Sequence, residues 1–486
     1  MRMNFEVLLL VLIMFHSYSC STSAKEEIEW PEKIQVILDN TKILEYERGD
    51  RLPLFLWPAI DPGELDEESA EILVKELNNR GIGIVSKWHW DDPEKRVAQA
   101  IIFGKAQKKL GLRINVDVIS LLYSFYDDTE NTAHIDEDGN PFFDESFGSR
   151  YNKMGCPFTL DSRKDIIRNR VEFFLERYKK ESLWVDFIFA DWEIDGPIEV
   201  NNAFESSKKC SVCRSHLGED FGFGEFQKTI REMRSYLQYY AYSLPVLSYY
   251  PDALVGNYAV YPNDGYRYWY DYFEFFVDDH PHITEQNAKY RKWYDDFPLT
   301  GYTFAMPVVY TWWEIFTWYD FDNTDYRWFY NMLLNASNAG KSTPHNIPVI
   351  SFVHWNTIFV GVDPDPDIVQ MSEHSYQELL WHMLFRGHDT FFNWSMRHEY
   401  PDEVRLLHEV WADAQKYGEF LDKGWPITFD VPKEPGVVIS GLAMDDRVLV
   451  RRTDFDTDHL PVEVLVGTKL ITVDYAPGVC KIYNLN

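Results

Sequence analysis

The sequence is poor in cysteine, in positive charge and in long apolar runs, and each shortage excludes something. Only 5 of the 486 residues are cysteine, and a chain of this size needs no disulfide framework to fold. Lys and Arg number 47 against 78 Asp and Glu, a formal net charge of −31, so the chain lacks the basic surface that nucleic-acid binding requires. Beyond the N-terminus no apolar run is long enough to span a bilayer, and there is no internal repeat or low-complexity tract.

Aromatic residues, in contrast, are abundant. They make up 16% of the chain, with 17 Trp and 30 Tyr, and hydrophobic residues reach 45%. A chain of this length and composition can bury a sizeable core and suits one large domain with a smaller one. Trp and Tyr have flat apolar faces on which sugar rings stack, although they also simply pack in cores. The excess is therefore compatible with a carbohydrate-binding cleft.

The N-terminus resembles an export signal. Residues 5–15 are apolar apart from Glu6, which fits the apolar region of a signal peptide and is too short to span a bilayer. Cys20 follows, in a position that resembles the lipid-attachment cysteine of bacterial lipoproteins, although the usual Leu three residues before it is absent. We expect a signal segment over 1–20 and a linker over 21–50. The protein would be exported, either anchored by lipid at the outer membrane or cell surface, or periplasmic or secreted.

Strand-like and helix-like segments alternate through most of the chain. Short and nearly continuous apolar runs, typical of parallel strands covered on both faces, predict strands at 53–58, 83–88, 114–119, 185–193, 245–250, 304–310, 348–355 and 389–394. Amphipathic patterns predict helices at 67–79, 93–110, 162–180, 223–243, 326–339 and 375–385. The alternation predicts an α/β fold with a (β/α)8 barrel of the TIM type over 51–424. From about Pro426 the helical pattern stops and short alternating strands follow, which predicts a small antiparallel β-domain over 425–486.

The segment 184–193, WVDFIFADWE, is the most informative for chemistry. Its apolar centre predicts a buried strand that ends in Asp191 and Glu193. Side chains alternate along a strand, so these two acids point to the same side. Two carboxylates at the end of an apolar strand can hold different protonation states, as general acid catalysis requires. The alternative is a structural pair that caps a helix or binds an arginine.

Other expected strand ends carry aromatic side chains. Active sites of TIM barrels lie at the C-terminal ends of the strands, where core layers would instead favour Val, Ile and Leu. We therefore expect an aromatic cleft around two carboxylates, the shape of a glycosidase site. The aromatic residues expected to line it are Trp88, Tyr249, Tyr250, Tyr310, Trp355 and Trp394.

Several short motifs, in collinear order, resemble the hyaluronidase family of glycoside hydrolases and, more loosely, chitinase-like enzymes. Asp-Trp-Glu at 191–193 is similar to the Asp-x-Glu that ends their fourth strand, and SYYPDALVGNY at 248–258 is similar to a segment after strand five. Pro-Val-Val-Tyr at 307–310 and GHDTFFNW at 387–394 are similar to strands six and eight. The resemblance covers roughly residues 52–395. The paired cysteines of animal hyaluronidases and the upstream acids of the chitinase signature are absent.

The resemblance implies retaining hydrolysis of a glycosidic bond with help from the substrate. Glu193 would protonate the glycosidic oxygen, while Asp191 would orient a 2-acetamido group whose carbonyl attacks the anomeric carbon. Aromatic residues would bind that group, namely Tyr249 or Tyr250, Tyr310, and Trp394 as the floor. For a substrate without an acetamido group, Asp195 or Glu314 is the candidate nucleophile or base. We expect a carbohydrate partner, no nucleic-acid partner and no cofactor.

Two other classes of protein stay open. A surface lipoprotein could bind glycans without catalysis, although binding alone needs no carboxyl pair. A metal-dependent hydrolase could use His89, His354 and cysteines, although these lack the paired His spacing of such sites.

Cys210 and Cys213 precede His216 in a C-x-x-C-x-x-H pattern, which is half of a metal site, and Cys156 could lie near them. A structural metal, a local disulfide and free thiols are all compatible with this pattern.

Overall fold

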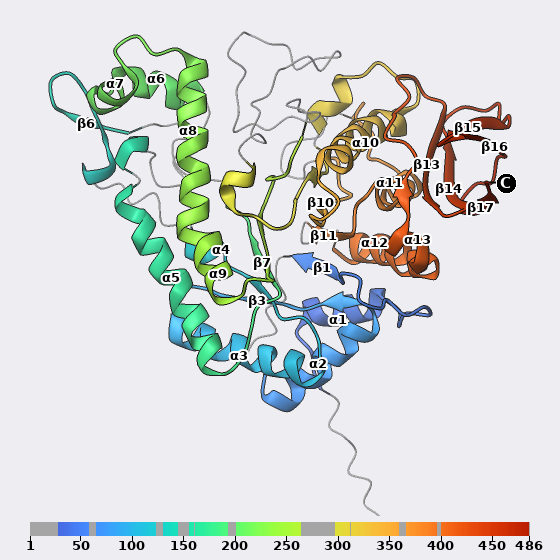
Figure 1. Ribbon diagram of the computed structural model, residues 1–486, viewed down its shortest axis with the longest axis horizontal. Helices are drawn as coiled ribbons and strands as arrows, with labels where there is room; N and C mark the ends of the chain where they lie inside the picture. The colour runs from blue at the N-terminus through green and yellow to red at the C-terminus, as the bar shows by residue number, and fades with distance from the viewer. Residues whose placement is uncertain are drawn as a thin grey trace, which may run out of the picture.

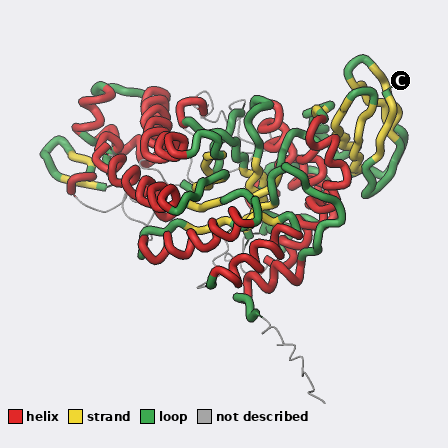
Figure 2. Tube along the Cα trace, turned by 60° about the horizontal axis from the view of Figure 1, so that its bottom comes forward, coloured by secondary structure: helices red, strands yellow, loops and turns green. Residues whose placement is uncertain are grey.

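A computed structural model describes residues 28–57, 65–122, 130–143, 155–159, 161–192, 201–263, 297–311, 313–358, 366–395 and 400–485. Its centre is a barrel of parallel strands surrounded by helices (Figures 1 and 2). In chain order the barrel strands are β1 (Leu54–Trp57), β2 (Ile82–Gly83) continued by β3 (Val85–Lys87), β4 (Asn115–Asp117), β7 (Phe187–Ala190), β8 (Leu254–Asn257), β9 (Val308–Val309), β10 (Ile350–Val353) and β11 (Thr390–Trp394).

Two parallel sheets join into one closed barrel. One sheet has the order β3-β4-β7-β8 and the other the order β2-β1-β11-β10-β9. They meet on one side where β2 runs into β3 through Ile84. On the other side the main-chain N–H groups of Thr303 and Phe304 donate to the carbonyl of Val255 in β8, at 2.9 and 3.4 Å. The expected α/β fold with a TIM-type barrel is confirmed.

Helices follow the strands and cover the barrel. They include α2 (Glu67–Asn79), α3 (Pro93–Lys109), α5 (Asp161–Lys180), α8 (Phe223–Gln238), α10 (Thr324–Ser342), α11 (Glu373–Leu384) and α12 (Tyr400–Ala414). The shorter helices are α1 (Glu32–Asn40), α4 (Ile119–Leu122), α6 (Asn201–Lys209), α7 (Ser211–Leu217), α9 (Leu244–Tyr249) and α13 (Gly418–Lys423). Side chains cap the N-termini of several helices. Asp66, for example, precedes α2 and accepts the Ser69 N–H at 2.8 Å. No helix in the described residues is long and apolar enough to cross a membrane.

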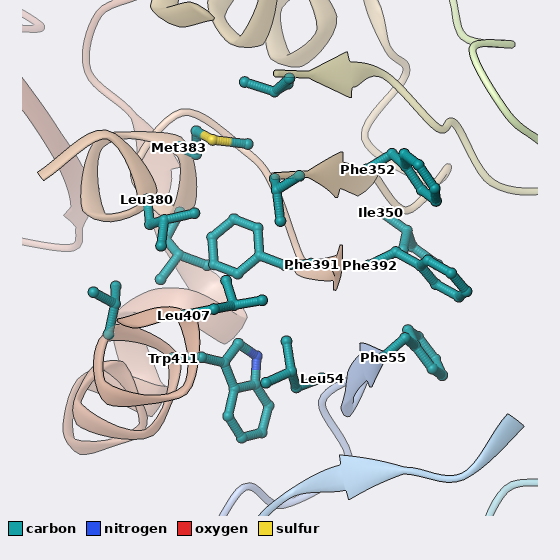
Figure 3. Close-up of a cluster of buried hydrophobic side chains, with 14 of the residues drawn as sticks. Leu54, Phe55, Ile350, Phe352, Leu380, Met383, Phe391, Phe392, Leu407 and Trp411 are labelled. Atoms are coloured by element: carbon teal, nitrogen blue, oxygen red, sulfur yellow. The ribbon is translucent and has the colours of Figure 1, made fainter. Parts of the chain in front are cut away.

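The barrel interior is filled by phenylalanine rings. Phe55 stacks on Phe187 with ring centroids 4.3 Å apart, and Phe189 contacts Phe392 at 4.4 Å and Phe352 at 6.0 Å. These rings come from strands on different sides of the barrel, so they identify the inward face of each strand. Side chains in between face outward: Figure 3 shows Leu54 and Phe391 directed toward Leu380, Leu407 and Trp411 of the helices.

The expected fifth strand at 245–250 is wrong, because this segment is helix α9. The helical chain runs on from α8 through a π-helical turn (Tyr239–Ser243), and Pro245 stands in the first turn of α9, where no intrahelical N–H is needed. A short apolar run with Val and Tyr has the composition of a strand, and periodicity alone cannot separate it from a buried helix. The true strand β8 contains Gly256, where an added Cβ would come within 2.5 Å of the Phe304 ring.

The C-terminal segment forms antiparallel sheets, as expected. β12 (Trp425–Pro426), β13 (Val437–Met444), β14 (Arg447–Asp454) and β17 (Lys481–Asn484) make one sheet, and β15 (Val462–Val466) pairs with β16 (Lys469–Val473). They lie beside α10, α11 and α13 (Figure 1). A buried ion pair between Arg451 of β14 and Glu378 of α11 joins this sheet to the barrel helices.

Candidate functional site

Two carboxylates face the barrel interior at the C-terminal ends of neighbouring strands. Asp117, the last residue of β4, pairs in register with Phe189 of β7, whose ring lies inside the barrel. Asp191 lies two residues beyond Phe189 and therefore points to the same side. Asp117 is almost completely buried, at 2% exposure. The expected position of Asp191, at the C-terminal end of the fourth barrel strand, agrees with this geometry.

The environment of Asp191 favours the protonated form of its carboxyl group. Burial, and next the charge of Asp117, raise the pKa of Asp191 to about 7. Although Asp191 as a residue is half-buried, its Oδ1 is fully buried and has no hydrogen-bond partner among the described residues. An oxygen of Asp117 accepts the main-chain N–H of Ile119 at 2.8 Å. Burial and the neighbouring Asp117 thus both favour the protonated form of Asp191.

Hydrogen bonds fix the main chain just after Asp191. The N–H of Trp192 donates to the side-chain oxygen of Asn257 at 2.7 Å, and the Asn257 amide donates back to the Trp192 carbonyl at 3.3 Å. Arg234 also donates to this carbonyl, at 3.5 Å. Asn257 ends β8, so the next barrel strand orients Asp191 and the point from which the chain continues to Glu193.

Two buried tyrosines and a half-buried tryptophan also lie at this end of the barrel. The hydroxyl groups of Tyr258, just after β8, and Tyr310, just after β9, are 2.8 Å apart and hydrogen-bonded. The Tyr310 ring stacks on Trp394 at 5.7 Å, and the Tyr258 ring meets Phe352 edge-on at 5.3 Å. Tyr310 and Trp394, both expected in the site, are therefore brought together at the end of the barrel where Asp191 lies.

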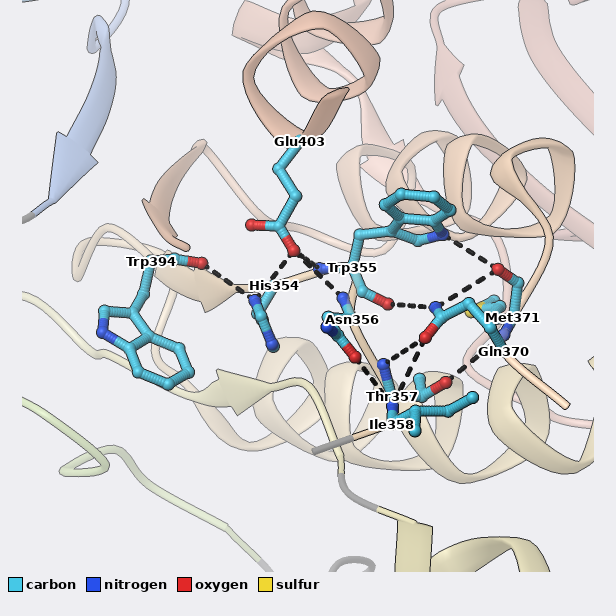
Figure 4. Close-up of polar contacts among 9 residues, drawn as sticks. All are labelled: His354, Trp355, Asn356, Thr357, Ile358, Gln370, Met371, Trp394 and Glu403. Atoms are coloured by element: carbon cyan, nitrogen blue, oxygen red, sulfur yellow. Dashed lines mark hydrogen bonds and ion pairs between the residues drawn. The ribbon is translucent and has the colours of Figure 1, made fainter. Parts of the chain in front are cut away.

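A buried histidine–glutamate pair lies next to Trp394 (Figure 4). Nδ1 of His354, just after β10, lies 2.9 Å from Oε1 of Glu403 in α12 and 3.1 Å from the Trp394 carbonyl. Glu403 Oε1 also accepts the main-chain N–H groups of Trp355 and Asn356, each at 3.0 Å. Burial works against ionisation of Glu403, but His354, a hydrogen bond from Ser395 and the main-chain N–H of Asn356 outweigh it and hold the pKa of the carboxyl below its usual value.

The His354 ring contacts Trp394 at 4.8 Å and Tyr310 at 5.7 Å. Because Glu403 holds one edge of the imidazole, these contacts fix how His354 and Trp394 lie relative to each other. Trp355, which was expected in the cleft, packs beside this group, and its indole N–H donates to the Met371 carbonyl at 2.9 Å.

Trp88 does not lie in the cleft. It is completely buried on the outer face of the barrel, where its ring packs 5.1 Å from Phe174 and 4.9 Å from Tyr178 of α5. Trp88 follows Lys87 at a strand end, but the alternation of side chains turns it outward. Trp88 was expected in the cleft, but the structure places it in the packing between the barrel and α5.

Tyr249 and Tyr250 also lie away from the carboxylates. Because 245–250 is helical, both belong to the outer layer, where Tyr249 neighbours Tyr250 at 6.1 Å. The Tyr250 hydroxyl donates to the carbonyl of Leu183, which precedes β7, at 3.2 Å. This contact is at the end of the barrel where β7 begins, opposite to Asp191. Tyr258, from the same segment 248–258, instead contacts Tyr310 just after the barrel strands.

Some expected site residues lie outside the described part of the chain. Glu193 and Asp195 belong to 193–200, and the side chain of Glu314 is likewise outside it. Of the residues considered for a metal-dependent hydrolase, His89 pairs with Asp91 at 2.6 Å and His354 with Glu403. Neither histidine is grouped with the cysteines.

The cysteine cluster differs from the expected C-x-x-C-x-x-H set in its histidine. Cys210 and Cys213 lie together with Cys156 and His134. The ring of His216 instead stacks on Phe158, with centroids 4.2 Å apart. His134 therefore replaces His216 as the candidate ligand.

Sequence reasoning missed Asp117, Tyr258 and the His354–Glu403 pair as parts of one site. The signal for Asp117 was present, because INVDVI places a single acid in an otherwise apolar strand. The signal for Tyr258 was lost with the misplaced fifth strand. Nothing local links Glu403, on α12, to His354, and only the fold brings them together.

A surface hollow lies at the other end of the barrel, where the strands begin. Residues that line it include Leu254, Pro348 and Asp389, while Asp117 and Asp191 are not among them. Because function in TIM barrels resides at the C-terminal ends of the strands, we place the candidate site at Asp117 and Asp191.

Comparison of the sequence with protein-family models and with curated proteins gives no match. Among solved structures, the fold is similar to α-L-fucosidase isoenzyme 2 from Paenibacillus thiaminolyticus (11% identity, 78% of this chain and 51% of that chain, TM-score 0.44). It is also similar to a GH36 α-galactosidase from Geobacillus stearothermophilus (11% identity, 91% and 56%, TM-score 0.43) and to bee venom hyaluronidase (13% identity, 66% and 94%, TM-score 0.31).

All three are glycoside hydrolases by name, so a structural similarity to such enzymes at low identity is confirmed. The chain spans about half the length of the first two. At these identities and TM-scores the similarity concerns the fold, and chemistry has to be argued from the site residues.

Proposed function

We propose that the protein is a glycoside hydrolase that cleaves an oligo- or polysaccharide at the C-terminal end of the barrel. The observation that carries the proposal is Asp191, where burial and the neighbouring Asp117 raise the pKa of the carboxyl group to about 7. Paired carboxyl groups with different pKa values are the equipment of glycosidic bond cleavage. Trp394, which is half-buried, can present its ring to a sugar, and the hydroxyl groups of Tyr258 and Tyr310 lie in the same group of side chains.

The roles follow the retaining scheme with a 2-acetamido sugar. Glu193 gives its proton to the glycosidic oxygen as the bond to the anomeric carbon breaks, and the acetamido carbonyl oxygen bonds to that carbon from the other side. Water then adds to the anomeric carbon, its proton goes to Glu193, and the acetamido group is restored. The configuration is retained after two displacements.

Asp191 and Asp117 serve the acetamido group in this scheme. As positive charge develops there, the Asp191 proton moves toward Asp117, and the Asp191 carboxylate accepts the acetamido N–H. The acids that chitinase-like enzymes carry upstream on the same strand are replaced here by Phe187 and Phe189. Asp117 supplies the second carboxylate from the neighbouring strand. Tyr258 and Tyr310 hydrogen-bond the acetamido oxygen, with Trp394 below the ring.

The test is product analysis on a panel of glycans with and without 2-acetamido groups, with anomeric configuration followed by NMR. Glu193→Gln should lower the rate about 10²–10⁴-fold without a change in fold, while Glu225→Gln, an exposed glutamate in the first turn of α8, should not. Normal turnover by Glu193→Gln would place the acid elsewhere. Binding without hydrolysis across the panel would favour the alternative, a surface lipoprotein that only captures glycans.

The same proposal includes export, with Cys20 as the lipid-bearing first residue of the mature chain. Mass spectrometry of the native protein should find an N-terminus at Cys20 with an added lipid mass. An unprocessed Met1 in a soluble cell fraction would contradict this part, without bearing on hydrolysis.

A further inference from the structure

Three cysteines and a histidine meet in a buried cluster away from the carboxylate pair. Cys156, Cys210, Cys213 and His134 are all buried, and one ligand atom from each lies within 4.8 Å of the others. The Sγ atoms of Cys156 and Cys213 are 3.5 Å apart, and Cys213 Sγ is 3.9 Å from Nδ1 of His134. We propose that these four side chains bind one structural zinc ion.

The distances match a tetrahedral zinc site. Bonds of about 2.3 Å to sulfur and about 2.0 Å to nitrogen place two thiolates about 3.8 Å apart, and a thiolate and an imidazole nitrogen about 3.5 Å apart. A disulfide requires about 2.05 Å between the sulfur atoms and would leave one of the three cysteines over. Three thiolates with one imidazole form a closed set that suits zinc and leaves no position for a substrate.

The surroundings are those of a metal–thiolate centre. The main-chain N–H of Ile135 donates to Cys210 Sγ at 3.5 Å, and such hydrogen bonds orient a thiolate that binds a metal. Phe142 stacks on His134 at 5.0 Å, and Phe158 and Val212 pack against the cysteines. This apolar shell would exclude water from the ion.

The backbone is also shaped to bring the ligands together. Cys156 donates its main-chain N–H to the Thr132 carbonyl at 2.8 Å. The adjacent Gly155 permits this approach, because an added Cβ there would lie 1.6 Å from the same carbonyl oxygen. Cys210 precedes the first residue of α7 and Cys213 lies in its first turn, so one short helix presents two ligands.

The site would join two connections that follow neighbouring barrel strands. β5 (His134–Ile135), β6 (Pro141–Phe142) and Cys156 lie between β4 and α5, whereas α7 lies between β7 and α8. β4 ends in Asp117, and β7 is followed by Asp191. Figure 1 shows α6, α7 and β6 together at the upper left, near the start of α8. A zinc ion here would hold the two connections together and so keep the strand ends that carry the carboxylates in place.

The test is the metal content of the full mature chain, purified without chelators and without a metal-affinity tag. We expect about one zinc per chain by mass spectrometry of the metals. Protein made with cobalt should show the thiolate-to-cobalt absorption of a tetrahedral site. Less than about 0.1 metal per chain, or a disulfide among Cys156, Cys210 and Cys213, would overturn the proposal. These readouts need no activity, so they are independent of the proposed hydrolysis.

Variants identify the ligands. His134→Asn and Cys213→Ser should lose the metal and the cobalt spectrum, while His134→Cys, which completes a four-thiolate set, should retain a metal. His216→Gln and Cys480→Ser are the matched controls. His216 lies on α7 together with Cys213 but stacks on Phe158. Cys480 is a buried free thiol in the C-terminal sheet region. Loss of the metal in His216→Gln but not in His134→Asn would refute the assignment. If the ligand variants do not fold, the metal content of the wild-type chain still decides.

Discussion

Asp117 and Asp191 end neighbouring strands of the barrel and direct their carboxyl groups into the same interior space. Burial and the charge of Asp117 raise the pKa of Asp191 to about 7, which gives the end of the barrel a proton that is available near neutral pH. This pair can be examined by substitution at either residue, and the two substitutions have different expected effects.

Asp117→Asn should lower the pKa of Asp191, because it removes the negative charge that disfavours ionisation there. The pKa should remain above 3.8, since burial is the larger cause of the shift and is unchanged. The measurement is the pH dependence of kcat/KM on a cleaved glycan, or carboxyl titration by NMR in the absence of activity. Asp252→Asn, in an exposed turn before β8, is the matched control. An unchanged profile in Asp117→Asn would show that the two carboxyl groups are not coupled.

Asp191→Asn should stabilise the folded protein at alkaline pH. The pKa of Asp191 is raised in the folded state, so wild-type stability from this group is fully present below about pH 4 and is lost as pH rises through about 7. The variant lacks this loss, and a shift from 3.8 to about 7 corresponds to a gain on the order of 4 kcal/mol at pH 8. Urea midpoints from pH 4 to 8 would measure it. A difference between variant and wild type that does not vary with pH would contradict the raised pKa.

Most of the barrel could be predicted because its helices and strands can be recognised from their own local sequence patterns. The helix expected at 67–79 is α2, residue for residue, since it has an Asp cap and a regular apolar stripe. The C-terminal strands were equally clear from alternation and short turns, for example at Asp445, which has a positive φ of 53° between β13 and β14. The error at 245–250 arose where an apolar run had no period to distinguish helix from strand.

The site was harder to predict than the fold, because its residues are joined by register and by long-range packing. Asp191 was found from its own strand, but only the pairing of Asp117 with Phe189 shows that Asp117 faces inward. In the cysteine cluster His134 is 76 residues before Cys210, whereas His216, close in sequence, stacks on Phe158 and is not part of the ligand group. The role of Glu193 stays a prediction.

Glu403→Gln should destabilise the protein at neutral pH, because Glu403 accepts two main-chain N–H groups and contacts His354 while fully buried. Hydrogen bonds to a charged group contribute about 1.5–3 kcal/mol each, and Gln retains only part of this. The folded-state pKa of Glu403 is lowered, so its stabilisation is present above the unfolded pKa and is lost as pH falls through the folded one. The cost of Glu403→Gln should therefore shrink as the pH falls below the ordinary pKa of 4.5. Glu409→Gln, on the exposed side of the same helix, is the control for thermal unfolding at each pH.

Arg451→Met should destabilise the protein, because it removes the ion pair that joins the barrel helices to the C-terminal sheet. Arg451 and Glu378 are 5% and 3% exposed, and Arg451 Nε donates to Glu378 Oε2 at 2.9 Å. Removing one partner of a buried ion pair leaves an uncompensated charge and costs about 3–5 kcal/mol, whereas replacing both partners is often neutral. Arg451→Met with Glu378→Gln should therefore recover much of the stability lost in the single variant, as measured by urea unfolding.

The control for this prediction is Arg447→Met. The ion pair of Arg447 with Glu419 is exposed, so its loss should cost less than about 1 kcal/mol. Equal losses in the single and double variants at 451 and 378 would mean that the packing of the arginine stem, and not its charge, holds the two parts together.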